Sequence, residues 1–396
     1  MIFFKKVMKL EKLTKVKPSA KFTLLLLSML TIMSNVAIVT VMPHLSEIFK
    51  DVPNIELYSR LMITLPSLAI ALLAPFLGYA VHRFGKRRSA IFSLLAFTLF
   101  GTAGFYLQSI YEILVSRFLF GVAIALLMII STSLVGDYFK SEERHRFMGA
   151  QSAFVSIGGI VFIVGGGLLS DINWRYPFAI YLLGVVVLGF VLRYLVEFER
   201  DSSLDDASAD VNAKFFYVYV LAFLFMTFFY ILPTQMPFLI INHFHSSGAF
   251  AGEIIATAFV FNALGAISFA KLKKRLSFSS LYLLGTSVMG GGFFLIGFVE
   301  NVNLFFITSP IMGFGGGMMM TTITAWTLSK AHHSKRVKSS AYLTSSLFFG
   351  QFVSPLVFHP FVDYLGIQKF FIVTGAFIFL GTMPFVIRNH WSKRQL

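Results

Sequence analysis

Cysteine is missing from all 396 residues, so the chain offers no disulfide, no thiolate ligand for a metal and no cysteine nucleophile. Charge is also scarce. Only 13% of the residues are charged, whereas a soluble domain carries about a quarter. Acids are the rarer kind, with 18 Asp and Glu against 33 Lys and Arg. These shortages exclude a soluble domain of ordinary composition.

Long hydrophobic runs take the place of the missing charge. Hydrophobic residues make up 57% of the chain, with 48 Phe and 16 Met, and the mean hydropathy is +0.78. A membrane-spanning helix needs roughly 20 apolar residues, and runs of that length recur throughout. The sequence therefore predicts an all-α membrane protein with twelve spans, at 22–43, 59–81, 89–108, 112–135, 146–169, 175–195, 215–241, 249–271, 280–299, 303–327, 339–360 and 368–387.

Lys and Arg are distributed unevenly between the predicted loops. An even number of spans places both termini on one side, and the loops of that side hold 28 Lys and Arg. The loops of the other side hold 4, namely Lys50, Arg60, Arg175 and Lys369, and Arg117 lies within a span. Because cytoplasmic loops carry the excess of Lys and Arg, both termini are predicted to be cytoplasmic. Topology thereby explains the formal charge of +15, and we expect no nucleic-acid partner.

One long charged segment, residues 196–214, divides the predicted spans six and six. Its composition is typical of a linker. Each half has a short basic loop between its second and third spans, and this similarity indicates a parallel repeat. We expect five parts, in chain order a basic cytoplasmic segment 1–21, a six-helix bundle 22–195, a cytoplasmic linker 196–214, a second six-helix bundle 215–387 and a cytoplasmic tail 388–396.

The first basic loop has the sequence Gly78-Tyr-Ala-Val-His-Arg-Phe-Gly-Lys-Arg-Arg88. It resembles the loop motif of the major facilitator superfamily. Gly78 is expected to permit close helix approach, Gly85 a tight turn, and Arg83 and Arg87 an anchor at the cytoplasmic face. The family usually has Asp where this chain has His82. The resemblance implies a cytoplasmic latch at this loop, and His82 gives that latch no fixed negative charge.

Other residues extend the resemblance over essentially the whole chain. Arg117 in span 4 is followed four residues later by Gly121, similar to a second motif of the family. Asp137 and Arg144, which follow span 4, are expected to join the latch. With Gln351 in span 11, they resemble the drug-exporter branch.

The resemblance implies the major facilitator fold, in which two pseudo-symmetric six-helix bundles form a secondary transporter. It implies a protein that is not an enzyme, needs no cofactor and acts as a monomer in a bacterial inner membrane. The expected partners are a small-molecule substrate, protons and the lipid bilayer.

Arg117 is the charged residue that lies deepest in a predicted span, about 8 Å from the outer end at 1.5 Å per residue. A charge at mid-helix costs about 2.5 to 3.5 kcal/mol on insertion, so such residues are functional candidates. Arg117 could bind substrate or couple transport to an ion, or it could hold backbone carbonyls as a structural residue. We favour the functional alternative and expect Arg117→Ala to abolish transport in a protein that stays folded.

Uncharged polar residues occupy the centres of three other spans. Asn35, Asn262 and Gln351 carry amides that both donate and accept hydrogen bonds, so they are predicted to contact a solute in a central cavity. The alternative is that each amide bridges two helices, as polar side chains do in helix bundles.

Span 7 contains Pro233 and Pro237, which favour a bend near the outer face. Tyr230 and Gln235 are predicted to line a gate at this bend. In span 10, residues 313–317 contain four glycines, for which close helix packing is the expected role.

Ion coupling would need titratable groups within reach of the bundle. The candidates are Arg117, Glu112, Glu253 and His359, and the last three lie near outer span ends. Histidine titrates near neutral pH, although an interfacial polar role is the alternative. No histidine pair has metalloprotease spacing, and no Gly-rich loop ends in Lys-Ser or Lys-Thr. We therefore predict no metal site and no ATP-driven transport.

The leading hypothesis is a proton-coupled exporter of small amphipathic molecules, neutral or anionic, that works by alternating access. A facilitator or importer of an anionic metabolite or siderophore, with Arg117 as the anion partner, is the alternative in the same fold. A membrane enzyme would need clustered acids or histidines, which the sequence does not place together. A channel is disfavoured by the two similar halves.

Overall fold

The computed structural model describes residues 16–139, 141–195, 216–330 and 336–392, and every regular element in these ranges is helical. The predicted linker 196–214 and most of the predicted basic segment 1–21 lie outside the described residues. The helical class that the sequence predicts is confirmed.

Ten helical elements make up the first half. They are α2 (Pro18–Val36), η1 (Val39–Val41), α3 (Met42–Ile48), α4 (Ile55–Phe84), α5 (Lys86–Gly101), η2 (Thr102–Phe105), α6 (Ile110–Tyr138), α7 (Ser141–Ile172), η3 (Tyr176–Leu182) and α8 (Leu183–Tyr194). The second half comprises α9 (Phe216–Phe229), α10 (Ile231–Phe238), η5 (Leu239–His243), α11 (Gly248–Leu272), α12 (Phe278–Gly297), η6 (Val302–Leu304), α13 (Phe305–Lys330), α14 (Arg336–Leu365) and α15 (Ile367–Ser392).

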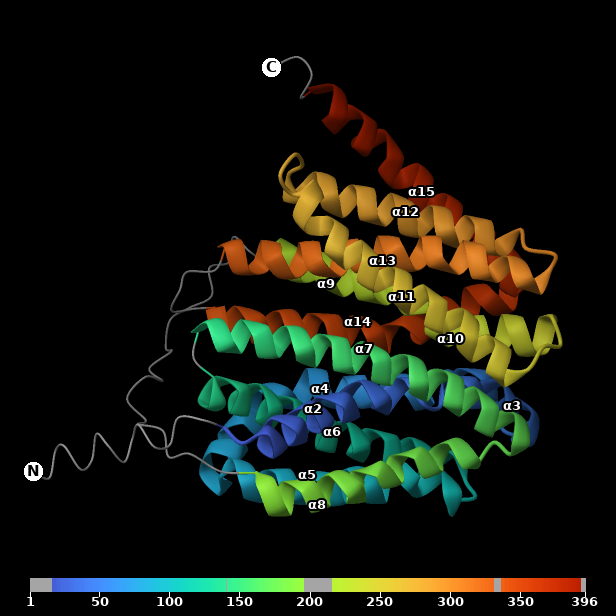
Figure 1. Ribbon diagram of the computed structural model, residues 1–396. Coiled ribbons are helices and arrows are strands. Elements are labelled where there is room, and N and C mark those ends of the chain that lie inside the picture. Colours follow the sequence, from blue (N-terminus) through green and yellow to red (C-terminus); the bar gives the residue numbers. More distant parts are fainter. Residues whose placement is uncertain (1–15, 140, 196–215, 331–335, 393–396) are drawn as a thin grey trace, which may run out of the picture.

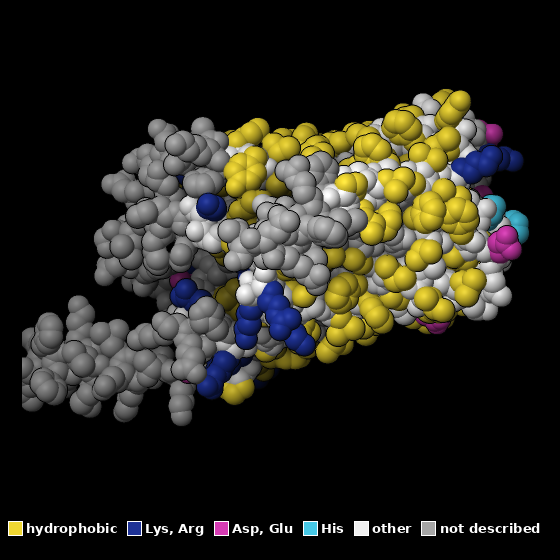
Figure 2. Space-filling view, turned by 90° about the horizontal axis from the view of Figure 1, so that it is seen from above, with side chains coloured by type: hydrophobic (Ala, Val, Ile, Leu, Met, Phe, Trp, Pro, Cys, Tyr) yellow, Lys and Arg dark blue, Asp and Glu magenta, His cyan; other side chains and the backbone are white. Residues whose placement is uncertain are grey.

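Twelve helical stretches in the described residues are long and apolar enough to cross a membrane, which confirms the predicted number. Their ends lie within five residues of the predicted ones, except that the second stretch ends at Ala74 rather than at 81. The first is longer because it runs from Pro18 to Ile48. We call the end of the molecule where α2 begins the inner end, and the opposite end, with residues 49–54, the outer end. In Figure 2 a wide hydrophobic belt separates Lys and Arg near one end from a few charged and histidine side chains at the other.

Two helix pairs join the halves. Helix α4 packs against α14, and α7 packs against α11, each pair with one helix from either half. Helices α5 and α8 lie along the far side of the first half, and α12 and α15 lie along the far side of the second (Figure 1). The residues that can hold the halves together therefore come chiefly from α4, α7, α11 and α14.

The predicted bend in span 7 is confirmed. Helix α9 ends at Phe229, α10 begins at Ile231, and a π-helical turn follows at Leu239–His243. Pro233 has no N–H to donate to the carbonyl four residues earlier, and its ring crowds that carbonyl. Pro237 repeats the effect one turn later. These two prolines explain why the span breaks at the outer end.

Glycines bring α13 against α11. A methyl group at Gly317 would lie 1.7 Å from the carbonyl oxygen of Asn262, and one at Gly313 would lie 2.1 Å from that of Ala258. The close packing predicted for these glycines is confirmed. The close approach predicted at Gly78 is not found, because no described residue lies within 4 Å of a methyl group placed there.

We expect Gly317→Ala to destabilise the protein by about 1 to 3 kcal/mol, the usual cost of overpacking a tight contact. Thermal unfolding of the purified protein in detergent measures this loss. Gly189→Ala in α8 is the matched control, since its methyl group meets no described residue within 4 Å, and alanine favours a helix by about 0.5 to 1 kcal/mol. Equal unfolding temperatures for the two variants would contradict the packing account.

Candidate functional site between the two halves

A buried arginine joins the halves at the outer end. Arg60 of α4 is only 1% exposed. Its Nε donates to Oε1 of Gln235 in α10 at 3.1 Å, and its Nη1 donates to Oε2 of Glu56 at 3.0 Å. Its guanidinium also lies 4.0 Å from the centre of the Phe238 ring. Gln235 and Phe238 belong to the second half, so Arg60 binds across the interface.

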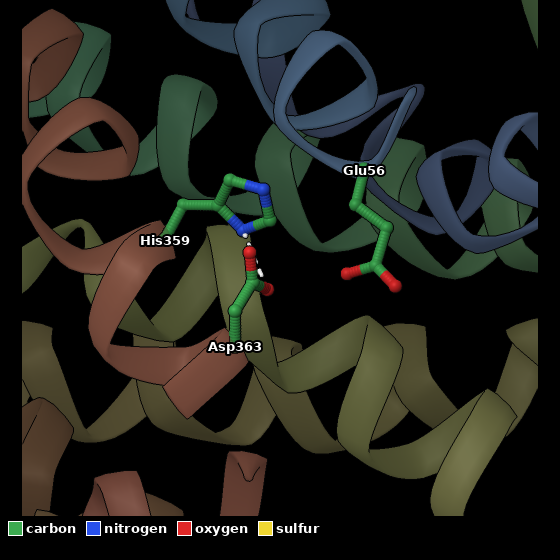
Figure 3. Close-up of side chains that lie close together, drawn as sticks. All are labelled: Glu56, His359 and Asp363. Carbon is green, nitrogen blue, oxygen red and sulfur yellow. Dashed lines mark ion pairs between the residues drawn. The ribbon is translucent and has the colours of Figure 1, made fainter. Parts of the chain in front are cut away.

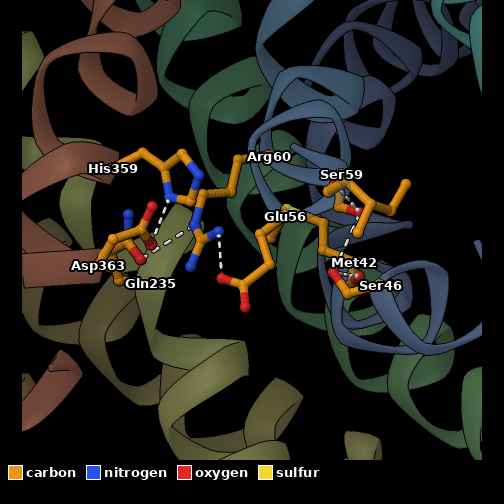
Figure 4. A network of polar contacts seen from close by, with 9 residues as sticks. Met42, Ser46, Glu56, Ser59, Arg60, Gln235, His359 and Asp363 are labelled. Carbon is orange, nitrogen blue, oxygen red and sulfur yellow. Dashed lines mark hydrogen bonds and ion pairs between the residues drawn. The ribbon is translucent and has the colours of Figure 1, made fainter. Parts of the chain in front are cut away.

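A histidine and an acid from α14 lie beside this arginine. Nδ1 of His359 is 3.3 Å from Oδ1 of Asp363, and Glu56 approaches them from α4 (Figures 3 and 4). The sequence dictates both pairs locally, since residues four apart share a helix face, as Glu56 and Arg60 do on α4. We call Glu56, Arg60, Gln235, His359 and Asp363 the outer cluster.

A second contact between the halves caps α11. Oδ1 of Asp171, from α7, accepts from the Gly248 N–H at 2.5 Å, and Oδ2 accepts from the Ala249 N–H at 2.9 Å. These N–H groups begin α11 and have no partner within that helix. A carboxylate at a helix N-terminus also meets the positive end of the helix dipole. Asp171 thus joins the halves by capping a helix of the other half.

A third contact lies at the break in span 7. Nδ2 of Asn35, near the end of α2, donates to the hydroxyl of Tyr230 at 3.3 Å. All three contacts cross from one half to the other. The interface therefore contains polar and titratable groups as well as apolar packing, and we call the part that holds these three contacts the gate.

The structure gathers four of the predicted site residues at this gate: Asn35, Tyr230, Gln235 and His359. Gln351 precedes His359 on α14 and lies closer to the inner end. Its side chain is buried, and its Nε2 has no hydrogen-bond partner among the described residues. Asn262 packs its backbone against Gly317 inside the second half. Of the coupling candidates, Glu112 and Glu253 are exposed and lie outside the outer cluster.

Arg117 lies away from the gate. Its Nη2 donates to the carbonyl oxygens of Phe100 at 2.6 Å and Gly101 at 2.8 Å, at the end of α5. The guanidinium is packed against the rings of Phe120, Phe178 and Tyr181, and the side chain is fully buried. These contacts all belong to the first half. They match the structural alternative for Arg117, because its charge is directed at carbonyls that end a helix.

The inner loop between α4 and α5 is held by residues of the same half. Gly85 adopts a φ of 84°, a conformation that favours glycine, so the tight turn predicted there is confirmed. Lys86 pairs with Asp137 of α6, and Arg87 Nη2 donates to the Leu192 carbonyl at 2.6 Å. Nearby, Arg144 Nη2 donates to the Gly136 carbonyl at 2.9 Å.

His82 and Arg83 are exposed at the end of α4. An acid that holds this loop is Asp137, which pairs with Lys86. The role of these residues in a latch between the halves stays a prediction.

Sequence reasoning missed most of the outer cluster. The sequence places Arg60 among the loop charges and assigns no role to Glu56, Asp363 or Asp171. The available signal was the pairing of Glu56 with Arg60 four residues later, directly before an apolar run. An arginine that is neutralised in this way can be buried, whereas an unpaired loop arginine stays in water.

Two helical bundles of six spans each, joined through facing helices, form an architecture that recurs in membrane transporters. The model of the Major Facilitator Superfamily matches residues 24–217 and 218–394. The chain therefore belongs to this superfamily, and it is a transporter rather than an enzyme.

Proteins with similar sequences include two resistance proteins. Multidrug resistance protein 2 of Bacillus subtilis is 33% identical over 147 residues, which are 35% of this chain and 36% of that protein. The class B tetracycline resistance protein of Escherichia coli is 25% identical over 237 residues, 60% of this chain and 56% of that protein. The matched stretches thus span about a third and just over half of these two relatives.

A solved structure is similar over nearly the whole length. The bacterial homologue of the human lysosomal transporter Spinster, in an inward-facing and occupied conformation, superposes with a TM-score of 0.75. It is 15% identical and covers 93% of this chain and 96% of its own. At this identity the likeness concerns the fold alone.

Proposed function

We propose that this chain exports small amphipathic molecules, neutral or anionic, across a bacterial inner membrane in exchange for protons. The observation that carries the proposal is the outer cluster, in which Arg60 holds Gln235 of the other half next to three titratable side chains. Transport by alternating access requires such a contact to form and break as the halves rock around a central site. The similarity to a multidrug and a tetracycline resistance protein supports export of amphipathic solutes.

The charges at the gate support proton coupling. Glu56 is an exposed acid paired with Arg60, and Asp363 is an exposed acid paired with His359 in the same cluster. A proton taken up by either acid removes a negative charge near Arg60 and weakens the network that joins the halves. Protons arriving at the outer end would then favour opening of that end. We assign coupling to this cluster ahead of Glu112 and Glu253.

Solute contacts are assigned to the amides and the hydroxyl predicted from the sequence. Asn35 and Tyr230 lie at the break in span 7, and Gln351 offers a buried amide on α14. These groups suit solutes that present hydrogen-bonding edges on an apolar body. The anionic-metabolite alternative needs Arg117 as its cation, and Arg117 is already directed at two carbonyls of its own half.

Reconstitution in liposomes tests the proposal. Tetracycline, a neutral amphipathic dye and an anionic amphipathic dye are presented to the protein with and without an imposed pH gradient. We expect at least one of them to move against its gradient when the pH gradient is present and to stop when an ionophore collapses it. Transport that ignores the pH gradient would rule out proton coupling, and no transport of any probe would rule out the substrate class.

The orientation is tested by labelling single introduced cysteines, because the natural chain has none. Positions 54 and 300 are exposed at the outer end, and positions 88 and 274 are exposed at the inner end. In intact cells we expect a membrane-impermeant maleimide to label the first pair and not the second. Labelling of position 88 or 274 from outside would reverse the predicted topology.

A further inference from the structure

We propose that Glu56, His359 and Asp363 form a binding site for a divalent cation such as Zn²⁺, which holds the outer end closed. Each residue offers one donor atom, and the three atoms all lie within 4.8 Å of one another. Figure 3 shows the two carboxylates and the imidazole turned toward a common point. The site was not predicted from the sequence, because its residues lie about 300 positions apart and only the packing of α4 on α14 joins them.

The donor atoms of the three side chains indicate which class of metal ion the site would bind. One imidazole nitrogen with two carboxylates is a set that suits Zn²⁺, which is often bound by three protein ligands and a water. Mg²⁺ and Ca²⁺ prefer oxygen ligands alone. The set therefore favours Zn²⁺, and other borderline cations such as Co²⁺ or Ni²⁺, over the alkaline-earth ions.

The ligands lie close to the positions that a metal site requires, and small side-chain rotations would complete it. His359 and Asp363 are four residues apart on one face of α14, the spacing that lets two side chains of a helix bind one ion. His359 is 7% exposed, so packing fixes its ring, and its Nδ1 has no hydrogen bond among the described residues. Glu56 and Asp363 are exposed. A cation can therefore reach the fixed imidazole from the outer solvent.

Arg60 is the group that could compete with a cation for Glu56. Its Nη1 contacts only Oε2 of that carboxylate, while Gln235 and Phe238 hold the guanidinium from the other side. The other carboxylate oxygen can bind a metal while Arg60 keeps its place. With a neutral histidine, Glu56 and Asp363 carry two negative charges against the single positive charge of Arg60, so a cation meets net negative charge.

Ligands from both halves make binding depend on conformation. Glu56 comes from α4 and the other two ligands come from α14, so opening of the outer end separates them. A cation that binds only the closed form must shift the protein toward that form. Zn²⁺ outside the membrane would then slow opening. This inference concerns the gate and holds whichever solute is carried and in whichever direction.

The binding test uses full-length purified protein from which any affinity tag has been removed. Titration with Zn²⁺ by calorimetry, and with Co²⁺ by visible absorption, measures affinity and ligand type without any transport. We expect one site per chain. Asp363→Asn and His359→Gln should each weaken it by more than about tenfold, since even the outer-shell partners of metal ligands contribute 10- to 100-fold. Glu47→Gln, which removes an exposed acid at the same end, should bind like the natural protein.

A distance measurement tests the consequence. Spin labels at positions 54 and 300 report the separation of the halves at the outer end. Zn²⁺ should move the population toward the short distance in the natural protein and leave it unchanged in Asp363→Asn. Absence of Zn²⁺ binding would overturn the site. So would Asp363→Asn and His359→Gln proteins that bind Zn²⁺ as tightly as the Glu47→Gln control. Binding without a change in the distances would overturn its action on the gate, and neither result bears on substrate or proton coupling.

Discussion

Replacing Arg117 with alanine is expected to unfold the first half rather than to alter what the protein carries. The side chain donates two charge-assisted hydrogen bonds to the carbonyls of Phe100 and Gly101. Hydrogen bonds to charged groups contribute about 1.5 to 3 kcal/mol each. Part of the total is offset because the guanidinium, whose Nε and Nη1 are buried without a hydrogen-bond partner among the described residues, no longer has to be desolvated. We expect a net loss of about 3 kcal/mol. The sequence alone gave the opposite expectation, a folded protein without transport.

Thermal unfolding in detergent and the amount of protein inserted in the membrane measure this loss. Arg117→Lys should recover part of the stability, because lysine keeps the charge but cannot present a planar fork of donors. Lys274→Ala, at an exposed inner position, should be as stable as the natural chain. A fully stable Arg117→Ala protein that fails to transport would return Arg117 to the binding or coupling role.

Replacing Arg60 with alanine should open the outer end. The variant loses the hydrogen bond to Gln235, the contact with the Phe238 ring and the partner of Glu56. A cation–π contact alone is worth about 0.5 to 2 kcal/mol, and part of the total is offset because Arg60 no longer has to be buried. We expect a net change of about 1.4 kcal/mol or more, which is a tenfold change in the ratio of closed to open protein.

Distances between spin labels at positions 54 and 300 measure this ratio. The matched control is Arg175→Ala. Arg175 also lies at the outer end, but its Nη1 donates to the carbonyls of Gly104, Phe105 and Leu107, all in its own half. The control should leave the distances unchanged. An Arg60→Ala protein as closed as the control would show that the outer cluster does not hold the gate.

The fold could be predicted from the sequence because the bilayer imposes its thickness on every span. Apolar runs of about 20 residues mark the helices, and two prolines mark the break in span 7 before any packing is known. Gly85 likewise needs only its own backbone preference to give a turn. Each of these features depends on residues that are neighbours in the chain.

The candidate site could be predicted only in part, because it depends on packing between distant helices. Gln235 and His359 were selected as single polar residues near span ends. That they meet Arg60 and Glu56 depends on α4 lying against α14 and on Gln235 of α10 accepting from Arg60, and no local pattern encodes these contacts. For Arg117 the sequence predicts a binding role, whereas the structure shows structural contacts. Its depth in the bundle suggested a binding role, while the carbonyls that it caps lie 16 and 17 residues earlier in the chain.

The central claim is that the outer contact between the halves must open in every transport cycle. A cysteine pair at positions 171 and 249 tests it, because Asp171 binds the Ala249 N–H across the interface at 2.9 Å and the natural chain has no other cysteine. Uptake of the probe that responds to the pH gradient is measured in liposomes before oxidation, after oxidation and after reduction. The account predicts that oxidation stops transport and reduction restores it, while each single-cysteine variant, which cannot form the cross-link, transports at the same rate before and after oxidation. Transport at full rate through the cross-linked protein would contradict the account.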